Sequence, residues 1–426
     1  MRRPEWLACS VGLLLLIGMA AAEGPVRAAH LLATALAFLC GAGAAIGIAY
    51  TLLVIALIGR FFARPTSEPS SFPSVTVIKP LHGHEWALLR NLSSFCEQDY
   101  SGPVQFVFGV HDAGDPALKA VDELRHLHPG AHITVVADSR LYGPNRKVSN
   151  TINMLEHARH DVLVFADSDV GVARNYLRNI VGELQRPGVR LVTCLYRGQP
   201  DPGFWPRLSA MATNYHFLPS AVTGVGLGLA HPCFGQTIAM RRETLDGIGG
   251  VEQFAHHLAE DYAIGEAVRR FGGKVSIPPF AISHACAETS FARLIAHELR
   301  WSGTIRAINP VGHLGSIVIH PFALAFLAAM LSGGALWSWL LAVMALVARL
   351  ALKLRADYVL HLPRGDLWLL PLLDLVSFGV FLASLLSTRV FWRGFSFDVG
   401  SGGRLSPAPG QLSGHPDSLQ GMRKPV

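Results

Sequence analysis

The chain has 426 residues and a net charge of +6; 50% of its residues are hydrophobic, only 15% are charged, and its mean hydropathy is +0.35. Ordinary soluble domains carry about 25% charged residues, so this composition excludes a simple soluble protein. The positive charge does not indicate nucleic-acid binding, because the basic residues do not gather with aromatic residues in a binding stripe.

The apolar residues are concentrated towards the two ends of the chain. Stretches that are nearly free of charge cover 7–22, 28–62, 317–350 and 367–388. A membrane span needs roughly 20 apolar residues, and several of these stretches are long enough. We therefore expect an N-terminal transmembrane hairpin over 1–65 and C-terminal membrane helices over 315–390.

Two details of these segments stay open. The first stretch also has the pattern of a cleaved signal peptide, with basic residues before it and AAAEG after it. The stretch 317–350 accommodates two short spans around SGG at 332–334, and a break at Pro371 would make the last segment re-entrant.

Asp374 lies inside an apolar segment, where a charge is costly, so we expect it to pair with an arginine.

Basic residues flank the apolar segments, as the positive-inside rule describes. They are Arg2, Arg3, Arg60, Arg64, Lys353, Arg355, Arg389 and Arg393. This distribution places the N-terminus and the middle of the chain in the cytosol. The six cysteines are scattered without a CxxC pair, so we expect them to be reduced.

The middle of the chain, 73–312, has the pattern of an α/β domain. Short apolar strands are expected at 74–80, 104–110, 132–138, 160–166 and 189–197. Helical periodicity between several of them, at 85–98 and 145–158 for example, predicts a mostly parallel sheet. The tail over 396–426 is rich in Gly, Pro and Ser and is predicted to be disordered.

Carboxylates follow two of the predicted strands. Asp112 comes after the second strand, and Asp167 and Asp169 come after the fourth, in VLVFADSDVG. Ligands of parallel sheets bind beyond the carboxyl ends of the strands. The DSD sequence fits either a tight turn or a site for a hard divalent cation such as Mg²⁺.

Six sequence pieces together carry a family resemblance: PLHGHEWALLRNLSSFCEQDY, HDAGDPA, NRKVSN, ADSD, AEDY and HELRW, in this order. The chain resembles the membrane glycosyltransferases of GT-A fold, and within them the ceramide glucosyltransferases. It is most similar to the bacterial branch associated with hopanoid biosynthesis, on the basis of GPNRKVSN, LVTCLYRG and HELRW. The resemblance covers about 28–394 and implies a GT-A domain flanked by transmembrane helices.

The resemblance implies roles for residues on the donor side. Asp169 is the direct ligand of a Mg or Mn cation, and Asp167 contacts the sugar nucleotide and supports the metal. Asp112 holds the uracil and ribose, although a loop cap is the alternative. Lys147 lies near the nucleotide, with a solvated lysine as the alternative, and Pro80 lies among the substrate-binding residues.

The resemblance also implies roles towards the acceptor. Asp261 is the general base, although it and Glu260 would also suit a helix N-terminus. In HELRW, His297 is a substrate-binding residue, although it stands where the family has Gln or Arg. Arg300 binds the diphosphate and Trp301 packs on the acceptor or sugar. The alternative for this segment is an interfacial helix with an aromatic anchor.

The implied activity is an inverting, metal-dependent transfer of N-acetylglucosamine from UDP-GlcNAc to a lipid alcohol such as bacteriohopanetetrol. The chain would be a multi-pass protein of the inner (cytoplasmic) membrane with a cytosolic catalytic domain. Alternatives are a ceramide glucosyltransferase and a processive polysaccharide synthase. The non-enzymatic alternatives are a lipid transporter and a scaffold, but neither function requires the carboxylates of the α/β domain.

Overall fold

A computed structural model describes residues 24–386, 389–392, 395–399 and 405–407. These residues form two compact units. An α/β unit comprises 56–314, 356–362 and the described residues from 380 onwards, and a helical unit comprises the described residues up to 55 together with 315–355 and 363–379. The segment expected as the α/β domain, 73–312, lies entirely in the α/β unit.

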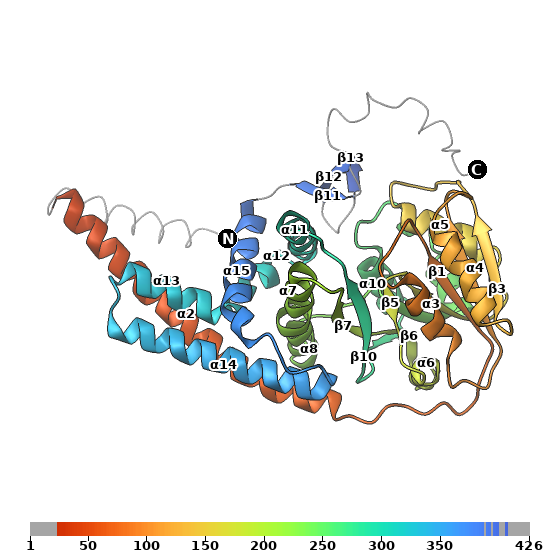
Figure 1. The fold of residues 1–426 in the computed structure, drawn as a ribbon, viewed down its shortest axis with the longest axis horizontal. Coiled ribbons are helices and arrows are strands. Elements are labelled where there is room, and N and C mark those ends of the chain that lie inside the picture. The colour runs from red at the N-terminus through yellow and green to blue at the C-terminus, as the bar shows by residue number, and fades with distance from the viewer. Residues whose placement is uncertain (1–23, 387–388, 393–394, 400–404, 408–426) are drawn as a thin grey trace. The chain divides into compact units, whose positions relative to one another are not determined.

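A seven-stranded sheet forms the centre of the α/β unit (Figure 1). Its strand order is β3 (His132–Ala137), β2 (Val104–Val110), β1 (Val75–Pro80), β4 (Val162–Ala166), β8 (Thr237–Arg241), β6 (Val189–Thr193) and β9 (Lys274–Ser276). The first four strands run parallel, whereas β8 is antiparallel to both of its neighbours. The predicted mostly parallel α/β fold is confirmed.

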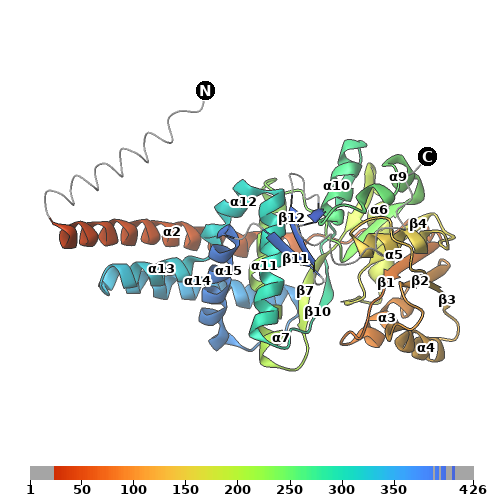
Figure 2. The same cartoon turned by 90° about the horizontal axis from the view of Figure 1, so that it is seen from above.

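Helices cover both faces of this sheet. On one face, Val148 and Ile152 of α5 (Arg146–Leu155) pack with Ile78 and Val107 of the sheet. Figure 2 shows α3 (Leu88–Cys96) and α4 (Ala117–Leu127) on the opposite face. Burial on both faces explains why the strands are continuous apolar runs instead of alternating ones.

The prediction of one strand over 189–197 is wrong. The chain leaves the main sheet at Cys194, because Leu191 to Thr193 bond to β8 whereas β7 (Leu195–Pro200) bonds in parallel to β10 (Ala281–Cys286). With β5 (Val170–Gly171), these strands form a second sheet. The residues from Leu191 to Tyr196 are buried on both sides of the break, so composition alone does not mark the change of partner.

The remaining elements of the α/β unit are mostly helical. They are α6 (Tyr176–Leu184), α7 (Phe204–Ala212), a π-helix (Thr213–Phe217), α8 (Leu218–Gly226), α9 (Arg242–Gly247), α10 (Glu260–Arg270), α11 (Phe291–Ile308) and α12 (Pro310–Gly315). Three short strands follow near the C-terminus: β11 (Arg389–Trp392), β12 (Phe395–Val399) and β13 (Leu405–Pro407). The last two fall in the segment expected to be disordered, and its other residues lie outside the described ones.

The helical unit holds most of the apolar helices, α2 (Pro25–Phe62), α13 (Pro321–Leu331), α14 (Leu336–Leu360) and α15 (Leu370–Leu386). Within the described residues, three helices are long and apolar enough to cross a membrane, and Pro310–Ile319 with Pro321–Leu331 forms a pair bent by 70°. The first half of the hairpin expected over 1–65, and with it the signal-peptide alternative, lies outside the described residues.

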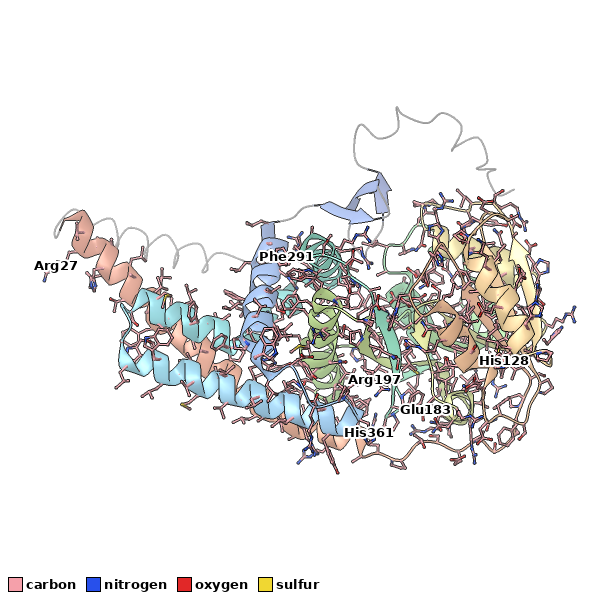
Figure 3. All side chains as sticks on the ribbon, in the orientation of Figure 1. Arg27, His128, Glu183, Arg197, Phe291 and His361 are labelled. Carbon is pink, nitrogen blue, oxygen red and sulfur yellow. The ribbon has the colours of Figure 1, made fainter. Side chains whose placement is uncertain are left out.

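The end of α14 belongs to the α/β unit. Arg197, which is labelled in Figure 3, donates from Nη1 to the backbone oxygen of Leu360, 2.5 Å away. The Tyr215 hydroxyl donates to Asp357 Oδ1 at 2.6 Å. Two side chains of the α/β unit therefore hold the last turn of a membrane-length helix.

Small residues allow the membrane helices to approach closely. A Cβ at Gly47 of α2 would lie 2.5 Å from the backbone oxygen of Val318, so only glycine fits there. Ala44, Ala325 and Ala345 lie together in the core of the helical unit. Small residues at helix contacts are typical of membrane bundles, where packing drives association in place of the hydrophobic effect.

The turn predicted around 332–334 separates α13 from α14, and Gly333 and Gly334 adopt left-handed backbone angles there. The alternative of a break at Pro371 is wrong. Pro371 is the second residue of α15, where the missing N–H has no helical partner to lose, and the helix continues through it. The sharp bend lies before Pro321 instead.

A buried ion pair joins α14 to α15, and it confirms the expectation that Asp374 pairs with an arginine. Arg349 Nε lies 3.0 Å from both carboxylate oxygens of Asp374, and the two side chains are 3% and 1% exposed. Removing one member would leave the other charge buried without its counter-charge, which typically costs about 3–5 kcal/mol.

We predict that Asp374→Asn lowers the free energy of unfolding by about 3 kcal/mol or more, because the Arg349 guanidinium stays buried. Denaturant unfolding in detergent measures the change. The double variant Arg349→Met with Asp374→Leu should recover most of the loss, since it removes both charges of this pair. A single variant as stable as the wild-type protein would contradict a structural role for the pair.

Candidate active site

The α/β unit contains a cavity of about 780 Å³. It lies at the carboxyl ends of β1 and β4, between the first turn of α5, the start of α10 and one side of α11. Eight of the residues predicted from the sequence line it: Pro80, Lys147, Asp167, Asp169, Asp261, His297, Arg300 and Trp301. Segments from most of the α/β unit therefore meet at one place.

Asp112 is the predicted site residue that does not line this cavity. Its side chain is exposed, and Oδ1 accepts a hydrogen bond of 2.9 Å from the Gly114 amide. This is the loop-cap arrangement named as the alternative. The adjacent His111 lines the cavity in its place, and its ring bonds to the backbone oxygens of Asp138 and Arg146. A nucleotide contact by Asp112 stays a prediction.

A buried lysine supports the turn that carries Asp167 and Asp169. Lys79, near the end of β1, is completely buried and donates from Nζ to the backbone oxygen of Asp167 at 2.7 Å. Its ammonium also lies 3.8 Å from the centre of the Phe95 ring. Burial lowers the pKa of Lys79 to about 7, against the attraction of the two aspartates. The lysine ties the turn to the end of the neighbouring strand.

Lys147 neutralises two carboxylates from different segments. Its Nζ lies 2.7 Å from Asp167 Oδ1 and 3.0 Å from Glu260 Oε1. Burial opposes its charge, but these carboxylates raise its pKa above the usual range. Asn145, the N-cap of α5, fixes the second carboxylate further by donating to Glu260 Oε2 at 3.1 Å. NRKVSN thus positions Lys147 at the first turn of α5.

Asp261 has the environment of a general base. Its two oxygens accept hydrogen bonds from the amides of Gly235 and Tyr262, at 2.9 and 2.8 Å. Burial, followed by the charge of the adjacent Glu260, raises the pKa of Asp261 to about 7. A Cβ at position 235 would lie only 3.2 Å from Asp261 Oδ2, which explains the glycine. A carboxylate with such a pKa takes up a proton readily near neutral pH.

Asp169 has an oxygen available for a ligand. Its Oδ1 is buried and has no hydrogen-bond partner among the described residues, while Oδ2 lies 3.4 Å from His284 Nδ1. Burial opposes ionisation, but the charge of His284 holds the pKa of Asp169 below its usual range. Burial and the charge of Asp169 raise the pKa of Glu85, which also lines the cavity, to about 7.

These donors fit a magnesium-type ion that is completed by substrate. The described residues contain no group of three His, Cys, Asp or Glu side chains that would hold a metal by themselves. Mg²⁺ commonly uses one or two carboxylates, with phosphate oxygens and water filling the other positions. The unpaired oxygen of Asp169 meets that requirement, whereas Lys147 occupies Oδ1 of Asp167.

An aromatic cluster, which we call the aromatic wall, forms another part of the cavity lining. The Trp301 ring on α11 lies 5.8 Å from the rings of Tyr196 and Phe217 and 4.7 Å from that of His297. Glu288 bonds to Nδ1 of His297 and fixes its ring. His297 and Trp301 of HELRW therefore face the cavity as part of the aromatic wall. The direct substrate contact predicted for His297 stays a prediction.

Sequence reasoning gave no role to three residues of the site: Lys79, Glu85 and His284. Lys79 had a recognisable signal, since it is a lysine within an apolar strand. Glu85 lies in PLHGHEW, which entered the family resemblance only as a block. His284 carried no signal, because its contact with Asp169 depends on the pairing of β10 with β5.

An α/β unit with carboxylates at the ends of its strands, together with membrane-length helices, is the arrangement expected of a membrane glycosyltransferase. The model of Glycosyl transferase family 21 matches residues 39–405, which is most of the chain. The protein belongs to this family.

Relatives and a solved structure resemble the chain over most of its length. Ceramide glucosyltransferase 1 of Caenorhabditis elegans is 24% identical over 380 residues, which is 84% of this chain and 79% of that protein. Ceramide glucosyltransferase 3 of the same organism is 24% identical over 360 residues, 80% and 76% of the two chains. The mannosyltransferase PcManGT of Pyrobaculum calidifontis, solved with GDP-Man and Mn²⁺, is 22% identical with a TM-score of 0.47, covering 83% and 99%.

We predict that Asp261→Asn lowers kcat by about 100-fold or more, because an amide cannot accept the acceptor's proton. In the wild-type protein kcat/KM should rise with pH and level off above about 7, as Asp261 loses its proton. The pH–rate profile from 5.5 to about 8.5 measures both effects.

Glu266→Gln is the matched control, since Glu266 lies on the same helix and pairs with Arg269 at 2.7 Å. It should leave both the rate and the profile unchanged. Calorimetry with the donor separates an effect on chemistry from an effect on binding. If Asp261→Asn weakens donor binding as strongly as it lowers the rate, Asp261 is a binding residue.

Proposed function

We propose that this family 21 glycosyltransferase is an inverting enzyme that moves a sugar from a UDP-sugar to the hydroxyl of a membrane lipid. One observation carries the proposal: Asp261, with a pKa of about 7, lines the same cavity as Asp169, whose Oδ1 is unpaired. A base for the acceptor and a site for the leaving diphosphate are both required for direct displacement.

On the acceptor side, Asp261 takes the hydroxyl proton as the oxygen attacks the anomeric carbon. The two amide hydrogen bonds hold the carboxylate in one orientation, so its basic oxygen need not reorganise during the reaction. Because no enzyme nucleophile forms a covalent intermediate in this scheme, the anomeric configuration is inverted.

On the donor side, the chain provides both an anionic and a cationic part. Asp169 would hold a Mg or Mn cation, which supplies charge stabilisation to the departing UDP diphosphate. Arg300 lines the cavity and would bind the diphosphate directly. Lys147 keeps Asp167 and Glu260 from repelling the donor, since one cation neutralises part of their charge.

The lipid acceptor is supported by the apolar composition of the chain and by the names of its relatives. We propose N-acetylglucosamine and a hopanoid such as bacteriohopanetetrol as substrates, on the sequence resemblance of GPNRKVSN, LVTCLYRG and HELRW. Glucosyl transfer to ceramide is the second candidate, because the relatives are named ceramide glucosyltransferases. Both reactions would use the same base and leaving-group site.

The positive-inside pattern supports a location in the inner membrane with residues 73–312 in the cytosol, where UDP-sugars are made. A processive polysaccharide synthase is less well supported, since a translocation channel needs more spans than the three, or up to four, found in the described residues.

A competition assay tests the substrate assignment. Purified protein receives UDP-GlcNAc and UDP-glucose together with bacteriohopanetetrol and ceramide, and mass spectrometry identifies the glycolipids. We expect N-acetylglucosaminyl bacteriohopanetetrol to predominate. Exclusive formation of glucosylceramide would reject the hopanoid assignment and keep the mechanism, whereas no glycolipid of any kind would reject lipid glycosylation.

We predict that Asp169→Asn abolishes transfer and weakens Mn²⁺ binding in the presence of UDP by about 10-fold or more, because one metal–carboxylate bond is lost. Electron paramagnetic resonance of Mn²⁺ measures binding independently of activity. Asp122→Asn, on the exposed face of α4, is the control. Full turnover by metal-free protein in EDTA would contradict the metal assignment.

We predict that Trp301→Ala raises the KM for the acceptor more than the KM for the donor, because the ring belongs to the aromatic wall, which would offer an apolar face to the acceptor. Initial rates with each substrate varied in turn measure the two constants. Trp301→Phe should restore most of the acceptor KM, since it keeps an aromatic face. A larger rise in the donor KM would place Trp301 on the sugar nucleotide instead.

A further inference from the structure

The cavity has both polar and apolar lining. Carboxylates and Lys147 line it, and so do the apolar side chains of Phe217, Leu229, Ile305 and Ile308. Leu229 is 71% exposed and Ile305 is 46% exposed, so the apolar lining reaches the surface of the unit. A soluble nucleotide sugar does not need an apolar mouth, and the apolar side chains require another occupant.

The chain around Leu229 contains no charge over a long interval. From Leu208 to Met240 there is no Asp, Glu, Lys or Arg. Most of this interval is buried in the α/β unit, so the missing charge is informative at its exposed part, Gly226–Leu229 and His231. Exposed segments of cytosolic domains are usually charged, because charge keeps them in water. An exposed and uncharged segment marks a surface that another apolar phase covers.

The end of α8 folds into a fixed turn over Leu227–Pro232, which we call the apolar turn. The amides of Leu229 and Ala230 both donate to the backbone oxygen of Gly224, at 2.8 and 3.1 Å. Gly228 has a φ of +67°, which a larger residue would adopt only with strain. Backbone bonds therefore hold Leu227 and Leu229 outwards, with 45% and 71% of their surface exposed.

Two membrane-length segments continue from this surface. The last turns of α2 belong to the catalytic unit, and Leu57 would lie 3.8 Å from a Cβ at Gly226, directly before the apolar turn. The helix α11, whose Ile305 and Ile308 also line the cavity, leads into α12, the first part of the bent apolar pair. Val311 and Leu314 of α12 are 81% and 59% exposed.

We propose that the apolar turn and the exposed apolar side chains of α11 and α12 lie in the lipid interface and form the port through which the acceptor's hydrocarbon body enters the cavity. The proposal rests on the proposed function, since it names the route of that acceptor. Its occupant is a bilayer lipid, because the surface is uncharged and joined at both sides to apolar helices. The lipid would keep its hydrocarbon among these side chains while its hydroxyl reaches Asp261.

Photo-crosslinking tests the port in the full-length protein. Benzoylphenylalanine replaces Leu229 in one variant and Leu127 in another, and each protein is reconstituted in phosphatidylethanolamine–phosphatidylglycerol vesicles that contain the acceptor. Leu127 is the matched control, because it is 58% exposed but lies at the end of α4, outside the cavity lining. We expect lipid adducts, identified by mass, at position 229 and none at position 127. Equal lipid labelling at both, no lipid at either, or protein adducts at 229 would overturn the proposal.

Kinetics provides an independent readout. Leu229→Gln should raise the acceptor KM about fivefold or more and leave the donor KM within about twofold, since a polar side chain disfavours hydrocarbon entry at the mouth. Leu127→Gln should change neither constant. Donor binding by calorimetry shows that the variant is folded. An unchanged acceptor KM in folded Leu229→Gln would overturn the port.

The two hypotheses fail in different ways. If the wild-type protein glycosylates no lipid but position 229 still labels with lipid, the proposed function fails and the interfacial surface stands. If lipid glycosylation proceeds normally and neither labelling nor the acceptor KM distinguishes position 229 from position 127, the port fails and the proposed function stands.

Discussion

The ammonium group of Lys147 connects the two halves of the proposed chemistry. It lies 2.7 Å from Asp167 and 3.0 Å from Glu260, so one cation holds the turn after β4 against the start of α10. Those two segments carry Asp169 and Asp261. Without this cation, several buried carboxylates would face one another, and like charges at short distance disfavour ionisation and close packing. The arrangement of the remaining site depends on this pair of contacts.

The charges around Asp169 and Asp261 shift the pKa values of the two carboxyl groups in opposite directions, as their different proposed roles require. Asp169 stays ionised, because His284 compensates its burial, whereas burial beside Glu260 raises the pKa of Asp261 to about 7. A metal ligand must be charged at neutral pH, and a base must exchange its proton near neutral pH. Environments that move two pKa values apart are a common way to give carboxylates of one site different functions.

The aromatic wall and the apolar mouth give this cavity the amphipathic character that lipid glycosylation requires. Trp301 contacts both Tyr196 from the second sheet and Phe217 from the π-helix, so the wall depends on the chain leaving the main sheet at Cys194. Continuation of that strand would have kept Tyr196 in the main sheet. The small three-stranded sheet thus has a functional consequence, because β10 also brings His284 to Asp169.

By itself the sequence determined the α/β class and the first four strands, because periodicity and turn residues are local properties, but it missed that the run 189–197 divides between two sheets. It placed Asp167 and Asp169 after a buried strand and identified the apolar helices, whereas Asp261 came from the family resemblance of AEDY. Only the tertiary structure decided that Lys147 pairs with Glu260, that His284 faces Asp169, and that Asp112 turns to its own loop. These contacts join segments far apart in the chain, and a long side chain reaches whichever partner the packing of those segments brings near.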